Sequence, residues 1–295
     1  MKSNVFPYHH LLAFSDADSL RRMSDKDRLD LLRKISGLPH SQANWHAILE
    51  LFFSWPDNSS KVQALFIADD LLEDWKVSLR NLNSSVNYIY QQGGLSMVTK
   101  IARSFTISRR ETSGGKELIT LANSPSSENL VQLEIDRSAI SMESLNAFAL
   151  SPYLRNISEL TFNGITFTSD LFEILLYKVN WTRVELLHLT NCGITDARIK
   201  LICDSPIVPG LRSLSLAGNS IGDEGASILA DTDDLSLIED LDLSRNFIGD
   251  LGARRLLTQS KMVNLKRLII RGNYIANRKD LEDLRPKGNR FVVEW

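Results

Sequence analysis

The 295-residue sequence lacks several features that mark common protein classes. It has only two cysteines, Cys192 and Cys203, which are too few for a disulfide framework or a four-thiolate zinc site. Its formal net charge is −2, so it lacks the basic excess of a dedicated nucleic-acid binder. No run approaches the roughly 18 apolar residues of a membrane span, and the N-terminal segment has no signal-peptide pattern. We therefore expect a soluble protein of the reducing cytoplasm, with a non-classically secreted effector as an alternative.

Catalytic motifs are missing as well. The five histidines show neither an H-E-x-x-H pattern nor a C-x-x-C companion, so we expect no metal site. The sequence contains no G-x-S-x-G elbow and no complete phosphate-binding loop. These absences predict a protein without a cofactor and without enzymatic activity.

A 27-residue period organises residues 128–280. The segment from Leu211 to Ala230 has the pattern L-x-x-L-x-L-x-x-N-x-I, and the same pattern returns 27 residues later, and again after that. Stepping backwards by 27 residues gives three more units without an insertion. The six units begin at Leu130, Ile157, Val184, Leu211, Ile238 and Leu265.

Each unit has a simple physical interpretation. The L-x-L piece predicts a short strand whose alternate side chains enter a shared core, and the segment after it predicts a helix. Asp223 and Asp250 stand where an acidic side chain favours the start of such a helix. A side-chain amide after the strand can bridge backbone groups of neighbouring units. The residues at this position of the six units form a ladder of such bridges. Ile165 has no polar group, and we expect a weaker ladder at its unit. The other residues at this position are Ser138, Cys192, Asn219, Asn246 and Asn273.

The amino-acid sequence of these units resembles the ribonuclease-inhibitor-like class of leucine-rich repeats, and it is similar to bacterial members of that class. The resemblance covers about residues 128–280 and implies an α/β solenoid, a horseshoe segment with parallel strands on the concave face and helices on the convex face. It also implies a surface for binding other proteins, without naming a partner.

The two ends of the chain lie outside this period. Residues 1–127 predict a mainly helical N-terminal or capping domain, with helices over residues 24–37, 41–55 and 59–75 and a core around Trp45, Trp55 and Trp75. Residues 281–295 predict a C-terminal cap, because a solenoid needs its last hydrophobic edge covered.

Candidate binding residues lie at the strand positions that point away from the core. One interpretation is that opposite charges on adjacent strands pair with each other and keep the face soluble. The other is a polar docking patch for a protein partner. Aromatic anchors are absent from this set, which leaves the N-terminal region and the helix face as rival surfaces. The set comprises Glu134, Asp136, Glu159, His188, Asp240, Asp242, Arg267 and Arg271.

The sequence therefore favours a non-enzymatic protein-interaction module that presents a curved surface to a protein partner and does not bind nucleic acid. One alternative is a regulator of a partner enzyme, similar to the GTPase activators of the same repeat class, with Arg245 or Arg271 at the contact. Another is an effector with an unrecognised activity in residues 1–125.

Overall fold

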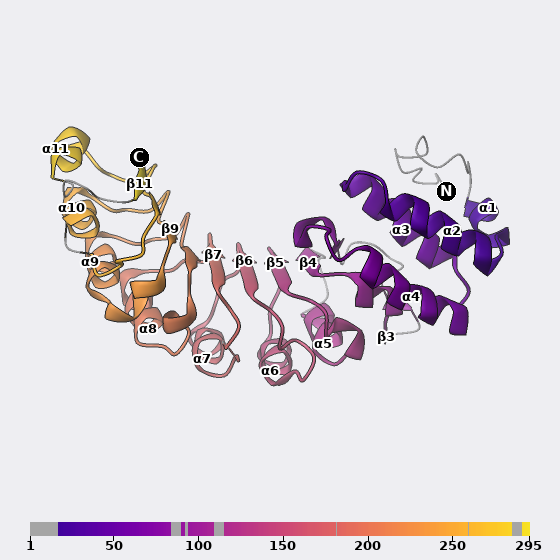
Figure 1. Cartoon of the computed structure of the whole chain (residues 1–295). Coiled ribbons are helices and arrows are strands. Elements are labelled where there is room, and N and C mark those ends of the chain that lie inside the picture. The colour runs from indigo at the N-terminus through magenta and orange to yellow at the C-terminus, as the bar shows by residue number, and fades with distance from the viewer. Residues whose placement is uncertain are drawn as a thin grey trace, which may run out of the picture.

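The computed structural model describes residues 17–83, 90–91, 94–108, 115–180, 182–258, 260–284 and 291–295. The prediction of no signal peptide concerns residues 1–19, of which residues 1–16 lie outside the described residues. The described chain forms a curved arc. A group of helices lies at its N-terminal end, and a long array of strands and helices forms the rest of the arc (Figure 1). None of the described helices is long and apolar enough to cross a membrane.

The N-terminal helices begin where the sequence offers capping side chains. The Ser24 and Ser41 hydroxyls accept hydrogen bonds from the Asp27 and Asn44 amides, which satisfies donors that have no partner inside a helix. Trp45, Trp55 and Trp75 are buried, as the sequence predicts. The helices are α1 (Ala17–Arg22), α2 (Asp25–Ser36), α3 (Gln42–Ser54) and α4 (Ser59–Leu71), followed by the 3₁₀ helices η1 (Val77–Leu79) and η2 (Met97–Ile101).

Nine strands form one continuous parallel sheet that lines the inner side of the arc (Figure 1). The strand order follows the chain, and the 27-residue register joins the strands from β5 to β10. The strands are β1 (Asn81–Asn83), β4 (Ser104–Ser108), β5 (Gln132–Asp136), β6 (Glu159–Asn163), β7 (Leu186–Thr190), β8 (Ser213–Ser215), β9 (Asp240–Asp242), β10 (Arg267–Ile269) and β11 (Val292–Glu294).

The sheet continues on the N-terminal side of residue 128. Ser104 pairs with Gln132, and Asn81 pairs with Ser104, so β4 and β1 extend the array into the region predicted to be mainly helical. The spacings of 28 and 23 residues differ from 27, which hides these two strands from a search for the period. A separate antiparallel pair, β2 (Tyr90–Gln91) and β3 (Gly94–Leu95), lies beside this segment.

Helices cover the outer side of the sheet along the arc (Figure 1). The core between the two layers contains the strand leucines, such as Leu187, Leu214 and Leu241, which are buried. The outer helices are α5 (Lys116–Ala122), α6 (Met142–Leu150), α7 (Ser169–Tyr177), α8 (Asp196–Cys203), α9 (Asp223–Asp231), α10 (Asp250–Thr258) and α11 (Arg278–Asp283). Short 3₁₀ helices η3 (Pro125–Ser127), η4 (Val208–Gly210) and η5 (Asp233–Leu237) join some helices to the next strand.

A buried amide ladder joins neighbouring units. The Asn219 side chain donates to the carbonyl of Leu189 in the preceding unit and accepts from the Cys192 and Ile194 amides. Asn246 and Asn273 make the corresponding bonds one and two units later. Burial raises the pKa of the Cys192 thiol to about 11, so the thiol stays protonated and donates to the Phe162 carbonyl. Ser138 donates to the Asp136 carbonyl, whereas Ile165 is buried and supplies no polar group.

A second ladder of hydrogen bonds runs along the helix starts, where the sequence predicts only that aspartates favour the beginning of a helix. Asp223 does more than begin its own helix, because its carboxylate accepts from the Gly249 and Gly252 amides of the following unit. Asp196 accepts from the Gly222 amide in the same way, and Asp250 accepts from the Ala276 amide. The 27-residue spacing of these three aspartates was the available signal.

The last unit is covered by β11, which pairs with β10 in parallel register. Phe291, Val293 and Trp295 pack against the core, and the Arg278 guanidinium lies 5.1 Å from the centre of the Trp295 ring. Within residues 281–295, for which the sequence predicts a C-terminal cap, β11 thus extends the sheet by one strand.

Candidate functional site

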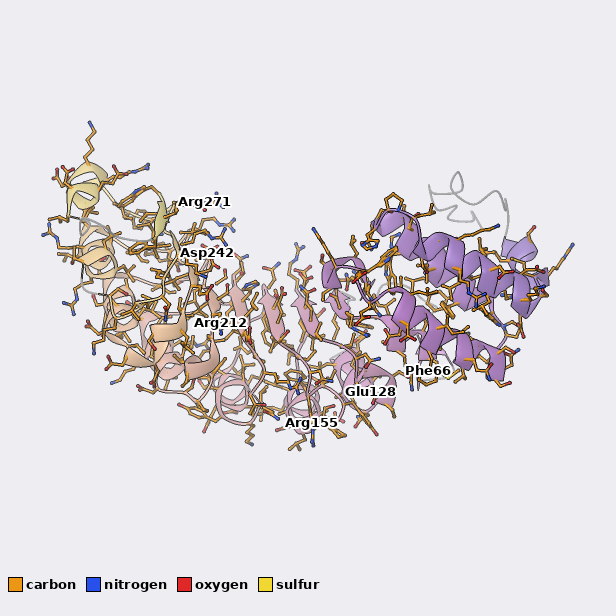
Figure 2. The ribbon with its side chains drawn as sticks, viewed as in Figure 1. Phe66, Glu128, Arg155, Arg212, Asp242 and Arg271 are labelled. Atoms are coloured by element: carbon orange, nitrogen blue, oxygen red, sulfur yellow. The ribbon has the colours of Figure 1, made fainter. Side chains whose placement is uncertain are left out.

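The concave face consists of the outward-pointing side chains of the nine parallel strands. In β5, β6 and β7 half-buried and buried residues alternate, so every second side chain leaves the core and faces the inner side of the arc. Figure 2 shows Asp242 and Arg271 on this inner side and Arg155 on the outer side. The eight residues predicted as binding candidates all belong to these outward positions or to their continuation beyond the strand end.

The first half of the concave face is held by hydrogen bonds that run between strands from uncharged donors to carboxylates. Gln132 donates to the Glu159 carboxylate at 2.7 Å, and Asn163 donates to Asp136 at 2.7 Å. The Thr106 hydroxyl lies 3.2 Å from the Glu134 carboxylate. These contacts fix the three carboxylates without cancelling their charge, except that exposed Arg137 lies 3.3 Å from Asp136.

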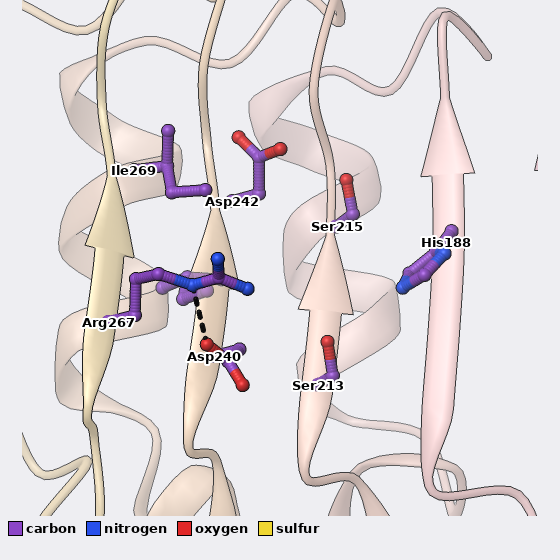
Figure 3. A pocket seen from close by; sticks show the side chains of 8 residues that line it. His188, Ser213, Ser215, Asp240, Asp242, Arg267 and Ile269 are labelled. Carbon is purple, nitrogen blue, oxygen red and sulfur yellow. Dashed lines mark hydrogen bonds and ion pairs between the residues drawn. The ribbon is translucent and has the colours of Figure 1, made fainter. Parts of the chain in front are cut away.

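The second half contains a hollow of about 200 Å³ (Figure 3). Small side chains at Ser213 and Ser215 leave this space between larger neighbours on either side. Arg267 crosses to Asp240 with an Nε–Oδ1 distance of 2.7 Å, which fixes one wall. The structure thus brings together four of the predicted residues, His188, Asp240, Asp242 and Arg267; the hollow is completed by Ser213, Ser215, Leu241 and Ile269.

Asp242 is the carboxylate of the hollow that has no ion pair within 4.0 Å among the described residues, although Arg267 lines the same hollow. Its Oδ1 accepts a hydrogen bond from the Ser244 amide at 2.9 Å, which orients the carboxylate but leaves its charge. His188, on the opposite side of the hollow, lies 3.3 Å from the Thr161 hydroxyl through its Nδ1. The hollow therefore offers a negative group, a histidine and two hydroxyls to an incoming side chain.

Pairing of opposite charges does occur, but mainly at the beginning of the strands. Glu185, Arg212, Glu239 and Lys266 occupy equivalent positions in four successive units. Their contacts measure 3.6 Å, 3.1 Å and 2.5 Å along the row. The hydrogen bond from Lys266 holds the pKa of Glu239 below its usual range. Lys266 is therefore engaged in this row, whereas Asp242 and Arg271 have no ion pair among the described residues.

Glutamate, aspartate and arginine are unequally distributed on the concave face. Among the described residues at its outward strand positions and at the position of Arg271 in each unit, carboxylates outnumber guanidinium groups by six to two, and one of the two is already paired; Arg137 and Arg245, in the turn after the strand, are not part of this set. The carboxylates are Glu134, Asp136, Glu159, Asp240, Asp242 and Glu294, and the guanidinium groups are Arg267 and Arg271.

The turn after each strand repeats an uncommon backbone conformation. A residue with positive φ occupies the same slot in six units, and it alternates between a larger residue and glycine. Only glycine adopts this region without steric cost, so a larger residue there is held by its surroundings. The slot comprises Arg137, Gly164, Asn191, Gly218, Arg245 and Gly272. Each larger side chain lies over the glycine of the next unit.

The family comparison agrees with this geometry. A family model for leucine-rich repeats matches residues 211–230 and 235–257. These residues are leucine-rich repeats. The flanking units of the array share their 27-residue register and the parallel strand pairing, so the fold is a leucine-rich repeat solenoid with a mainly helical N-terminal region.

Three solved structures are similar to part of this chain. An internalin from Listeria monocytogenes is 17% identical over 68% of this chain, with a TM-score of 0.40. A leucine-rich repeat protein from Leptospira interrogans is 15% identical over 68%, with a TM-score of 0.35. A protein from Bacteroides fragilis is 14% identical over 66%, with a TM-score of 0.32. The chain spans 57%, 52% and 66% of these structures in turn, and no curated protein matches it.

Proposed function

We propose that the chain is a non-enzymatic interaction module whose concave face receives a protein partner that presents basic side chains. The observation that carries this proposal is the excess of carboxylates on that face, together with the unpaired charge of Asp242 inside the hollow. Complementary electrostatic potentials on two proteins speed their encounter and fix their relative position. The potential of a curved surface is the sum of the charges of many residues.

The size of the hollow supports a side chain as its occupant. Pockets for small molecules enclose about 300–1,000 Å³, and this hollow encloses about 200 Å³. A lysine or arginine side chain from a partner could place its cationic group near Asp242 and its aliphatic stem against Leu241 and Ile269. A binding role also fits the filled interior of the helical region, where Trp45, Ile48 and Phe52 are fully buried.

The proposal includes a reducing compartment, because Cys192 and Cys203 are both buried as free thiols. Burial raises the pKa of Cys203 as well, which keeps its thiol in the protonated and less reactive form. The two cysteines then serve the core and the ladder, and the binding role rests on the concave face alone.

The test is a concave-neutral variant, Glu134→Thr, Glu159→Gln and Asp242→Ser. Each new residue already occupies the same slot in a neighbouring unit, at Thr161, Gln132 and Ser215, so the fold should be preserved. The matched control removes three exposed charges from the outer helices, through Glu143→Gln, Glu173→Gln and Glu224→Gln.

Partners captured from the native host by the wild-type chain are then titrated against both variants. We expect the concave-neutral variant to bind at least tenfold more weakly and with a smaller dependence on salt, because it lacks the attracting charges. The helix-face control should bind as the wild type does. Equal binding by the two variants, or a greater loss in the control, contradicts the proposal.

A further inference from the structure

Two aromatic rings lie exposed at a slot where other units carry small residues. Phe247 and Tyr274 occupy equivalent positions in successive units, just after the ladder asparagines, and are 52% and 70% exposed. Their ring centres are 5.7 Å apart with a tilt of 31°, so they form one apolar surface. The corresponding residues in the four earlier units are Ala139, Thr166, Gly193 and Ser220.

Neither ring belongs to the hydrophobic core of the described chain. Burying a large apolar side chain contributes about 1.5–3 kcal/mol, and both rings forgo much of that gain. The slot accepts a small residue in four units, so the array does not need a ring there. Aromatic side chains are enriched at the centres of protein interfaces, and a cluster of them on a surface marks a contact site.

Two arginines precede the rings in the same two turns, Arg245 two residues before Phe247 and Arg271 three residues before Tyr274. Arg245 and Arg271 are exposed, and neither side chain has a hydrogen bond or an ion pair among the residues that the structure describes. The Arg245 amide donates to the Arg271 carbonyl at 2.8 Å, which places the two residues side by side on adjacent units. The stem of Arg245 lies over Gly272, two residues before Tyr274.

The backbone of Arg245 adds an independent observation. Its φ is +54°, in the left-handed region, where a non-glycine residue costs about 1–2 kcal/mol. The units on either side have glycine at this slot, at Gly218 and Gly272, so the array does not require a side chain at 245. Arg137 has the same conformation but lies beside Asp136, whereas Arg245 has no comparable local contact.

We propose that Arg245, Phe247, Arg271 and Tyr274 form a second docking surface, the aromatic edge, which binds an acidic segment of a protein partner that also carries an apolar side chain. The rings would receive the apolar side chain, and the two guanidinium groups would hold aspartate or glutamate through paired N–H donors. This combination of aromatic residues and arginine is typical of the few residues that dominate binding energy. Figure 2 places Arg271 at the C-terminal end of the array, where this edge lies.

Charge favours a protein segment over a nucleic acid at this edge. Arginine and aromatic rings can also stack on bases. The adjacent concave face, however, carries six carboxylates, and the chain has a formal net charge of −2, so an extended phosphate backbone would be repelled. A short acidic segment needs only the local charge of the two arginines.

The aromatic edge adjoins the concave face, with which it shares Arg271, and differs from it in preferred charge. Its binding of an acidic segment therefore does not depend on the proposal for a basic partner on the concave face. The concave-neutral variant should retain it, which allows either proposal to fail without the other.

The experiment uses the full chain and three defined probes. These are fluorescent octapeptides in which Asp and Glu alternate with Phe, Leu and Trp, the same peptides with Lys and Arg in place of the acids, and a single-stranded uridine oligonucleotide. One variant is Phe247→Ser with Tyr274→Ser, and the other is Arg245→Gly with Arg271→Thr. Each new residue occurs at the same slot in another unit, so folding should be retained, as unfolding curves will verify.

We expect acidic peptides to bind the wild-type chain at least tenfold more tightly than their basic counterparts and than the oligonucleotide. Each double variant should lose at least tenfold in affinity. Arg137→Gly, a change at the equivalent left-handed slot, should leave binding unchanged. No preference for acidic peptides, tighter binding of the oligonucleotide, or full binding by either folded double variant would overturn the proposal.

Discussion

The left-handed slot at the strand ends shows how a single residue is fixed by its neighbour in the next unit. At Gly193, which lies outside this slot, two residues after Asn191, an added Cβ would meet no atom within 4 Å, whereas at Gly218, within the slot, it would clash with the Asn191 side-chain oxygen. The φ values of the two glycines, +66° and +68°, are nearly the same. The pair therefore separates the cost of the backbone conformation from the cost of crowding.

We predict that Gly193→Ala lowers the free energy of unfolding by about 1–2 kcal/mol, through the left-handed conformation alone. Gly218→Ala should cost about 1 kcal/mol more, because Asn191 must move and lose its hydrogen bond to Asn163. Urea unfolding of the two variants measures the difference. Adding Asn191→Gly to Gly218→Ala should remove the excess; an excess that persists would show that crowding by Asn191 is not its cause.

At this scale the sequence predicts the outward direction of the concave residues but not their contacts. Alternation in L-x-L places Asp240 and Asp242 on one face, and the strand register agrees. The hollow could not be predicted, because it depends on how far Arg267 reaches across to Asp240 and on the space that Ser213 and Ser215 leave. The binding roles of these residues stay predictions.

The helix starts join one unit to the next through aspartate. Asp250 accepts hydrogen bonds from the Ala276 amide at 2.9 Å and from the Asn277 amide at 3.1 Å. These bonds hold the pKa of Asp250 below its ordinary value of 3.8, and the bond from the Asn277 amide has the largest effect. A carboxyl whose pKa is lowered by folding stabilises the fold above its unfolded pKa, and this stabilisation is lost as the pH falls through the folded pKa.

We predict that Asp250→Asn destabilises the array at pH 7 and that the difference from wild type shrinks steadily between pH 5 and pH 2. Unfolding by urea at several pH values measures this difference. Asp280→Asn, on the exposed surface of α11, is the control. A difference between Asp250→Asn and wild type that stays constant down to pH 2 would show that the charge of Asp250 does not support the following unit.

Helices and strands could be predicted where a local sequence pattern defines them. They could not be predicted where strand pairing with a distant segment defines them. The helices α2 and α3 follow from Ser24 and Ser41, because a cap and an apolar face lie within one segment. The membership of β1 and β4 in the sheet depends on pairing with distant segments, at spacings outside the period. Short strands of this kind contain too little local pattern to reveal their partners.

Across the whole molecule, the helical region and the array are joined by a partly buried charge cluster, of which Arg80 is the buried member. Arg80, which is 2% exposed, binds the carbonyls of Leu72 and Ile101 and pairs with Asp69 of α4. Asp69 also accepts two hydrogen bonds from Arg103, at 2.8 Å and 2.9 Å. Burial lowers the pKa of Arg80, which indicates that the cation relies on this carboxylate.

We predict that Asp69→Ala lowers the free energy of unfolding by about 3 kcal/mol, because it leaves the Arg80 charge buried without its partner. The control is Asp233→Ala, which removes an exposed partner of Lys261 and should cost less than about 1 kcal/mol. Urea unfolding followed by tryptophan fluorescence compares the two. Equal losses would contradict the assignment of Asp69 as the link between the two regions.

The central claim is that a partner with basic side chains lies against the concave face. Its most direct test places a photo-activated cross-linking residue at Ser215, beside the hollow, and separately at Leu201, on the exposed surface of the outer helix α8. After capture from the native host, mass spectrometry identifies the linked peptides. We predict links from position 215 to lysine- or arginine-rich segments of one partner and none to that partner from position 201. Links from position 201 alone, or links from position 215 to acidic segments, would contradict the claim.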